Sequence, residues 1–371
     1  MRKIFCIISV LLLVYSATVC ADEFDGIMTD DLKGEITDSF EIVQSDFLYG
    51  TNALELIQKM NSGDFSIGVK GIGNYVKEKF SDEMRNNFGF FIKITVLILL
   101  VSLIENICCD DKRKKAVSLL CASVVIITMI GLFSDLSVYV TETVDRLSLF
   151  INSLIPILLT LTATSGHTAT AGMLNPIMLG VSSVITLVVK SVIIPLLFIG
   201  LALKLTDSVS GKNYLSAFGK QVYGLIKWIT GFTLTIYIGI ITVIGTAAPN
   251  VDEVTLKTAK YAVGTFVPYV GNMLTDSVEL VLNCSSVVKN SVGVAGLIGV
   301  LSVVAVPCIK ISVKVILFNI LSTLVSPVAG KPVSNALDSV SSCLNIMLGL
   351  LFVVSVMYIL SITVIIFIGG A

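Results

Sequence analysis

Ionisable side chains are scarce in this sequence, and the types that catalysis uses most often are the scarcest. Of 371 residues, 14% are Asp, Glu, Lys or Arg, one is histidine and one is tryptophan. The hydrophobic fraction is 55% and the mean hydropathy is +0.94, well outside the composition of soluble domains. The chain is therefore predicted to be an integral membrane protein.

Signatures of catalysis and of metal binding are missing as well. The eight cysteines show no C-x-x-C pair and no Cys/His ligand spacing, so neither a metal site nor a disulfide framework is predicted. The stretch VAGKPVS lacks the first glycine and the Lys-Ser/Thr pair of a P-loop, and neither H-E-x-x-H nor G-x-S-x-G occurs. The single histidine, His167, stands among Thr and Ser without an orienting partner, so we interpret it as a loop residue. We expect no enzyme, no metal and no cofactor.

The first 21 residues have the pattern of a signal peptide. Arg2 and Lys3 precede an apolar run at 4–15, and Val19 and Ala21 suit cleavage before an acidic stretch. A signal peptide at 1–21 would deliver the segment that follows it to the outside of the cytoplasm.

That exported segment, 22–87, is acidic, with 14 Asp and Glu against 6 Lys and Arg. Its apolar residues recur at helical spacing, which predicts one or two amphipathic helices. They are Ile36, Phe40, Val43, Phe47, Ile72, Val76 and Phe80. The segment is either a small helical cap or a docking surface for a partner outside the membrane, and the sequence does not choose between the two.

The remainder, 88–371, is predicted to be a polytopic transmembrane domain. One crossing needs about 20 mostly apolar residues. Four segments meet this requirement clearly: 88–107, 116–140, 228–248 and 343–368. The loop CCDDKRKKA between the first two segments and the stretch 204–227 are both rich in lysine, so the positive-inside rule places both in the cytoplasm.

The region between these basic loops allows two arrangements. Both loops lie in the cytoplasm only if the chain crosses the membrane an odd number of times between 141 and 204. Either 149–163 is re-entrant and does not cross, or 173–205 breaks near Lys190 and Pro195 into a hairpin of two short helices. Lys190 is the candidate intramembrane charge. In a single long helix its ammonium must meet an acidic group or water, whereas in a hairpin it lies at the tip.

Beyond the crossing 228–248, the segment 249–290 is nearly balanced in charge and is predicted to be extracytoplasmic. Pro268 and Gly271 interrupt it, and the apolar spacing that follows indicates a turn and then an amphipathic helix. Such a helix would lie on the outer membrane face or dip into the protein.

The C-terminal part is predicted to cross the membrane three times. Segments 291–309 and 315–329 flank a cytoplasmic edge marked by Lys310 and Lys314, and the last crossing brings the C-terminus inside. The expected fold is all-α, with about seven to nine transmembrane helices, some of them broken or re-entrant, plus a small exported N-terminal helical segment. On one helix face, Gly293, Gly296 and Gly299 predict close helix packing.

Three stretches carry a family resemblance: GLIKWITGFTLTIYIGIITVIGTAA, the segment from VDEVTLKTAKYAVGTF to SVGVAGLIG, and the late PCIKI. Together they resemble stage III sporulation protein AE of endospore-forming Firmicutes, from about residue 88 to the C-terminus. The residues that match this pattern are candidates for partner contact or for a structural motif. They are Lys257, Lys260, Tyr261, Pro268, Gly271, Asp276, Ser277 and Glu279.

The resemblance implies a membrane subunit of a multiprotein, secretion-like channel or feeding-tube apparatus between mother cell and forespore. It implies as partners the other membrane proteins of the stage III A operon and, through them, a forespore membrane protein. The implied location is the outer forespore membrane, and homo-oligomers are possible in such an assembly. The alternative, motivated by Lys190 and the proline-interrupted segments, is a self-contained secondary transporter for a small solute. Nothing in the composition suggests nucleic-acid binding.

Overall fold

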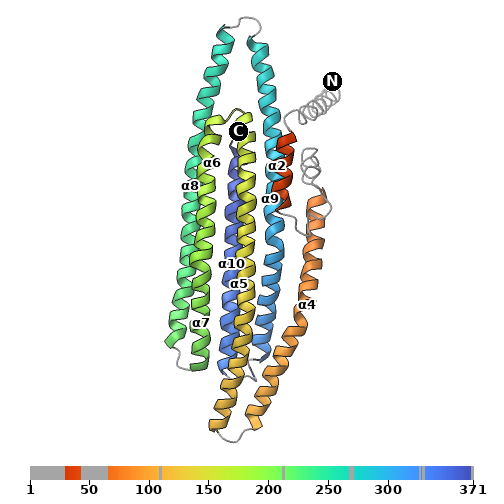
Figure 1. Ribbon diagram of the computed structural model, residues 1–371, viewed down its shortest axis with the longest axis vertical. Coiled ribbons are helices and arrows are strands. Elements are labelled where there is room, and N and C mark those ends of the chain that lie inside the picture. The colour runs from red at the N-terminus through yellow and green to blue at the C-terminus, as the bar shows by residue number, and fades with distance from the viewer. Residues whose placement is uncertain are drawn as a thin grey trace, which may run out of the picture.

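Every element of the described chain is a helix, and most of these helices are far longer than one membrane crossing requires (Figure 1). The computed structural model describes residues 30–42, 66–107, 111–210, 214–266, 271–325, 327 and 331–368, with the side chains of some helical stretches, chiefly 66–75, 246–266 and 271–281, left out. The elements are α2 (Asp30–Glu41), α4 (Ser66–Ile107), α5 (Asp111–Thr164), α6 (Thr168–Val188), the π-helical turn η1 (Val189–Ile193), α7 (Ile194–Ser210), α8 (Tyr214–Phe266), α9 (Gly271–Val325) and α10 (Lys331–Phe367).

The helices form an elongated bundle with α10 at its centre. α10 packs against α9, α5, α7 and α8, while α8 and the α6–α7 pair lie on one side of the bundle and α9 and α4 on the other (Figure 1). The core consists mostly of aliphatic and aromatic side chains, among them the fully buried Tyr358, Phe150 and Phe318. At one end α8 and α9 extend beyond their neighbours, and at the other end α4 and α5 do so.

Five stretches among the described residues are long and apolar enough to cross a membrane: Ser123–Thr164, Thr168–Ser208, Leu215–Gly245, Leu282–Val325 and Pro332–Phe367. The prediction of an all-helical membrane protein is confirmed at this level. The count of seven to nine crossings is unconfirmed, and the predicted crossing 88–107 lies in α4, whose side chains are described only in part. Each stretch has 31 residues or more, whereas about 20 suffice for the hydrocarbon layer.

Two pairs of predicted segments turn out to be single helices. Segments 116–140 and 149–163 belong to the uninterrupted α5, and 291–309 and 315–329 belong to α9. The prolines Pro156 and Pro307 lie inside these helices. A proline removes one backbone hydrogen bond, and neighbouring helices in a bundle compensate well enough for the helix to continue.

The structure contains neither of the two arrangements expected between the basic loops. Residues 149–163 are not re-entrant, because they complete α5, and 173–205 is not a hairpin, because α6, η1 and α7 follow one another without a break. The wide η1 turn, in which the Ile194 N–H donates to the Val189 carbonyl, ends two residues before Pro195. Widening the helix there relieves the clash that a proline ring makes with the preceding turn.

The turn between α5 and α6 has a well-defined cap. Gly166 has φ 93°, the His167 N–H donates to the Thr162 carbonyl at 3.1 Å, and the Gly166 N–H donates to the Ala163 carbonyl at 3.0 Å. This is the Schellman pattern, which needs a left-handed residue and therefore favours glycine. His167 lies in this turn, as the sequence predicts.

The two basic regions lie at the same end of the molecule. Figure 1 shows that α4 ends and α5 begins at the end where α7 gives way to α8 and where α10 begins. α10 ends toward the opposite end, which does not support the expectation that the C-terminus shares a side with the basic loops. That expectation divides the segment at Lys310 and Lys314 into two crossings, whereas α9 is one helix.

At its N-terminal side the described chain contributes one short helix. In α2, Ile36 and Phe40 are buried, and the Phe40 ring meets that of Phe150 edge to face, with centroids 5.5 Å apart. The expected amphipathic helix is therefore present here, and its apolar face packs on the bundle. The signal peptide, Val43 and Phe47 lie outside the described residues.

The predicted glycine face of α9 packs as expected. A Cβ atom at Gly293 would meet Ile366 of α10, and one at Gly296 would meet Leu154 of α5. At Gly299 it would lie 2.6 Å from the ring of Phe150. These glycines let the backbone of α9 approach α5 and α10 closely.

Candidate functional site

The predicted partner-contact residues lie on the hairpin of α8 and α9. α8, which ends at Phe266, and α9, which begins at Gly271, carry seven of the eight positions, and Pro268 lies outside the described residues. Their side chains lie outside the described residues. The list is Lys257, Lys260, Tyr261, Pro268, Gly271, Asp276, Ser277 and Glu279.

Lys190 meets an acidic group on the neighbouring helix. It lies in η1, and its Nζ donates to both carboxylate oxygens of Asp145 on α5 at 2.9 Å. Both side chains are 40% exposed. This is the partner that a lysine in a single long helix requires. Asp145 is 45 residues away from Lys190 along the chain, and no local spacing in the sequence connects the two.

Other polar contacts continue along the interface of α5, α6 and α10. The hydroxyls of Ser148 and Ser182 are 3.3 Å apart. Those of Thr186 and Tyr358 are 3.4 Å apart. Such contacts join helices inside an apolar bundle, where unpaired polar groups are costly.

Two further lysines are accommodated differently. Lys289 on α9 is fully buried, and its Nζ donates to the Ile368 carbonyl at 2.8 Å. Ile368 directly follows α10, so the ammonium lies at the negative end of that helix dipole. Lys310 lies over the ring of Tyr139 at 4.4 Å and 3.9 Å from a Glu83 carboxylate oxygen. The sequence analysis missed the burial of Lys289, because the residue stands at the edge of a polar segment.

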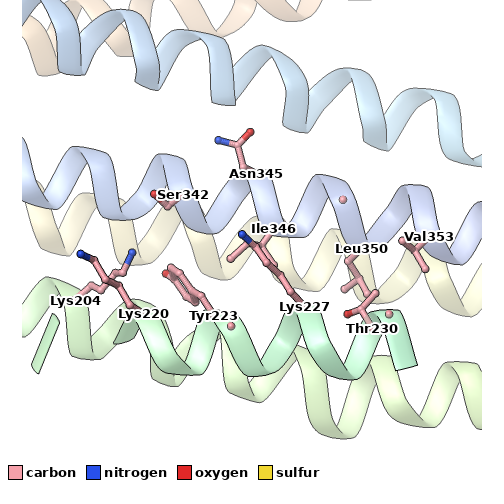
Figure 2. A pocket seen from close by; sticks show the side chains of 13 residues that line it. Lys204, Lys220, Tyr223, Lys227, Thr230, Ser342, Asn345, Ile346, Leu350 and Val353 are labelled. Atoms are coloured by element: carbon pink, nitrogen blue, oxygen red, sulfur yellow. The ribbon is translucent and has the colours of Figure 1, made fainter. Parts of the chain in front are cut away.

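Three lysines gather around a cavity between α7, α8 and α10. The cavity has a volume of about 690 Å³ and lies toward the end of the bundle where α7 ends and α8 begins. Lys204 comes from α7, Lys220 and Lys227 come from α8, and α10 contributes Ser342 and Asn345. Figure 2 shows Lys204 and Lys220 at one end, Lys227 beside Ile346 in the middle, and Thr230, Leu350 and Val353 at the other end.

The cavity is polar at one end and apolar at the other because of two helix faces. On α8, residues 220, 223, 227 and 230 follow one another at steps of three and four, and on α10 residues 342, 346, 350 and 353 do the same. Both helices run away from the basic end of the molecule (Figure 1). The Lys204 Nζ lies over the ring of Tyr223 at 4.4 Å, a cation–π contact that fixes its position.

Among the described residues, no group of three or more His, Cys, Asp or Glu is placed to hold a metal ion. The chemistry of the cavity is that of cationic donors beside an apolar slot. Such an arrangement suits binding of an anion and lacks the paired acid and base that a hydrolytic centre needs.

Comparison with known proteins gives a consistent picture. A family model described as stage III sporulation protein AE matches residues 51–369. The curated Stage III sporulation protein AE of Bacillus subtilis (strain 168) is 29% identical to this chain over 282 residues, which are 76% of this chain and 71% of that protein. No solved structure matches.

Proposed function

The chain belongs to the stage III sporulation protein AE family, and from this membership we propose that it is a membrane subunit of a multiprotein channel that links mother cell and forespore. Membership supports a role in sporulation, and the five long apolar helices suit a multi-pass membrane protein. The channel itself is the further step of the proposal.

The proposed partners are the other membrane proteins of the stage III A operon and, through them, a protein of the forespore membrane. The proposed location is the outer forespore membrane, which derives from the mother cell. In this arrangement the end of the bundle opposite the basic loops faces the space between the two membranes.

The observation that carries the proposal is the length of α8 and α9. They have 53 and 55 residues, and at about 1.5 Å per residue each is roughly 80 Å long. The hydrocarbon layer is about 30 Å thick. With a membrane around the five apolar stretches, the ends of α8 and α9 away from the basic loops would project beyond the hydrocarbon layer (Figure 1). Seven of the eight family-matching positions belong to these two helices.

The test reverses charge on this hairpin. In cells that make the tagged full chain, the double variant Asp276→Lys and Glu279→Lys should reduce co-purification of the other stage III A membrane proteins. The expected loss is about tenfold or more, since like charges brought together at an interface cost several kcal/mol. Spore yield should fall with it, while the amount of chain in the membrane fraction stays unchanged.

The matched control, Asp110→Lys and Asp111→Lys, makes the same change in net charge at the opposite end of the molecule. It strengthens the positive charge of a loop assigned to the cytoplasm, so insertion should persist. If the Asp276→Lys and Glu279→Lys variant co-purifies the other stage III A membrane proteins in the same amount as the unmodified chain does, the proposal is contradicted.

A second candidate function, a secondary transporter for a small solute, rests on the Asp145–Lys190 pair. Charged pairs within apolar helices mark ion or substrate pathways in many transporters, and this pair lies at a π-helical turn. The purified chain alone in liposomes should then take up a solute, and uptake should be lost in Lys190→Met. Absence of uptake across a broad solute panel would argue against this function.

A further inference from the structure

The cavity between α7, α8 and α10 has three lysines and no carboxylate in its lining. Lys220 and Lys227 are exposed and Lys204 is half-buried. The nearest acidic groups on the same helices are already engaged: Asp207 accepts a hydrogen bond from the Leu215 backbone N–H at 3.2 Å, and Asp338 accepts one from Ser322. Within the described part of the chain, none of the three lysines forms an ion pair. The lining therefore carries three cationic groups and no anionic one, although the Asp338 carboxylate attracts Lys204 from outside the lining.

The same cavity continues into an apolar slot. Beyond Lys227 it is lined by Thr230, Ile346, Leu350 and Val353, which belong to stretches apolar enough to cross the membrane. A soluble anion, such as free phosphate, would leave this part without a partner. An acidic peptide would have to bring backbone polar groups into apolar surroundings, which is costly. A ligand with an anionic head and a hydrocarbon tail matches both halves.

Glycines keep the slot open. Gly231 on α8 and Gly349 on α10 line it, and a Cβ atom at either of them would meet no other atom within 4 Å. They differ from Gly293, Gly296 and Gly299, which are needed for helix contact. Glycine inside a helix lowers the stability of the helix by up to about 1 kcal/mol relative to alanine. At these positions the missing side chain leaves space in the slot. The volume of about 690 Å³ is within the range of ligand pockets.

The depth of the cavity in the membrane is indicated by the only tryptophan. Trp228 follows Lys227 directly, is 63% exposed, and stacks on Phe232 with ring centroids 5.0 Å apart. Exposed tryptophan in membrane proteins concentrates at the level of the lipid headgroups. The basic residues at this end also place it on the cytoplasmic side, where anionic lipids attract lysine.

We propose that this cavity binds one anionic phospholipid. The ammonium groups of Lys204, Lys220 and Lys227 hold the headgroup phosphate, and one acyl chain lies along the slot between α8 and α10. The site would couple the position of the peripheral helix α8, and with it the projecting hairpin, to the lipid composition of the membrane.

The experiment measures binding of two lipids to the full-length chain in detergent micelles by native mass spectrometry. The probes are phosphatidylglycerol, which is anionic, and phosphatidylcholine, which has no net charge. The unmodified chain should bind one phosphatidylglycerol in preference to phosphatidylcholine. Replacing Lys220 and Lys227 by Gln should reduce this preference by about fivefold for each lysine. Both side chains are exposed, so the variant should fold.

Two further variants separate the site from general surface charge. Lys77→Gln with Lys93→Gln removes the same charge from exposed positions on α4, and its lipid preference should match that of the unmodified chain. Gly349→Leu leaves the charge unchanged but fills the slot, and it should weaken phosphatidylglycerol binding. A loss in the Lys220/Lys227 variant that the α4 control does not share supports the proposal.

Three results would overturn the proposal. The first is equal binding of the two lipids by the unmodified chain. The second is an unchanged preference in the Lys220/Lys227 variant. The third is stoichiometric binding of inorganic phosphate, added alone, without binding of phosphatidylglycerol, which would identify a site for a free anion.

Discussion

Single lysines inside apolar helices show how this molecule tolerates charge. Lys190 is neutralised by Asp145 at 2.9 Å, whereas Lys289 has the Ile368 carbonyl at 2.8 Å. The first arrangement uses a charge partner and the second uses the end of a helix dipole. Both avoid an unpaired ammonium among hydrocarbon groups, which is the costly alternative.

At this scale, we predict that Lys190→Met destabilises the chain by about 1–3 kcal/mol, between the values for exposed and buried pairs. The variant leaves the Asp145 carboxylate without its partner. Asp145→Leu alone should have a comparable effect, and the double variant should cost less than the sum of the two. The measurement is a double-mutant cycle of denaturant unfolding in micelles. Additive effects would show that the pair contributes no coupling energy.

The helices are long because they continue through prolines, which often end a helix. α5 passes Pro156, α6 passes Pro176 and α9 passes Pro307, while the π turn adapts the chain to Pro195. Long helices of this kind need close neighbours, and the glycines of α9 provide them. The contact of Gly299 with the Phe150 ring joins α9 to α5 at a point where α2 also packs, through Phe40.

For this element we predict that Gly299→Leu destabilises the bundle by about 1–3 kcal/mol or more, because the added side chain has no room. A Cβ atom there would lie 2.6 Å from the Phe150 ring, and that ring is fully buried. The matched control is Gly239→Leu on α8, where a Cβ atom meets nothing within 4 Å. Melting temperatures of both variants in micelles give the comparison. Equal melting temperatures would mean that α9 does not depend on this close approach.

The two ends of the bundle can be told apart by the connections that lie at each of them. The ends of α4 and α7 and the start of α10 lie at one end, and the turn at His167 and the C-terminus lie toward the other (Figure 1). The lysines before Ala116 and around α7–α8 predict that the first end faces the cytoplasm. The C-terminus should then face away from the cytoplasm.

The corresponding prediction concerns membrane topology. In a chain without native cysteines that is made in vegetative cells, where it inserts into the cell membrane, single cysteines at Arg113 and Lys212 should react with an impermeant thiol reagent only after the cells are permeabilised. Cysteines at His167 and Gly370 should react in intact cells, because an odd number of crossings separates them from the basic loops. Labelling of Gly370 together with Lys212, under permeabilised conditions only, would contradict the arrangement of α9 and α10.

Composition and charge by themselves determined the class of this protein. Few charges and long apolar runs make a helical membrane protein unavoidable, because every backbone group in the hydrocarbon layer needs an internal hydrogen bond. The lysine-rich loops indicated which parts share a side, and the structure places both at one end. The polar and glycine positions of the C-terminal half carried the family resemblance, which the family match confirms.

Only the tertiary structure decided where helices end and which distant residues meet. Whether a proline ends a helix depends on whether neighbouring helices satisfy the freed backbone, and no local pattern records that. The pairing of Lys190 with Asp145, the burial of Lys289 and the gathering of Lys204, Lys220 and Lys227 around one cavity each join residues from separate helices. Such contacts depend on helix packing across the bundle, which sequence spacing along a single helix does not specify.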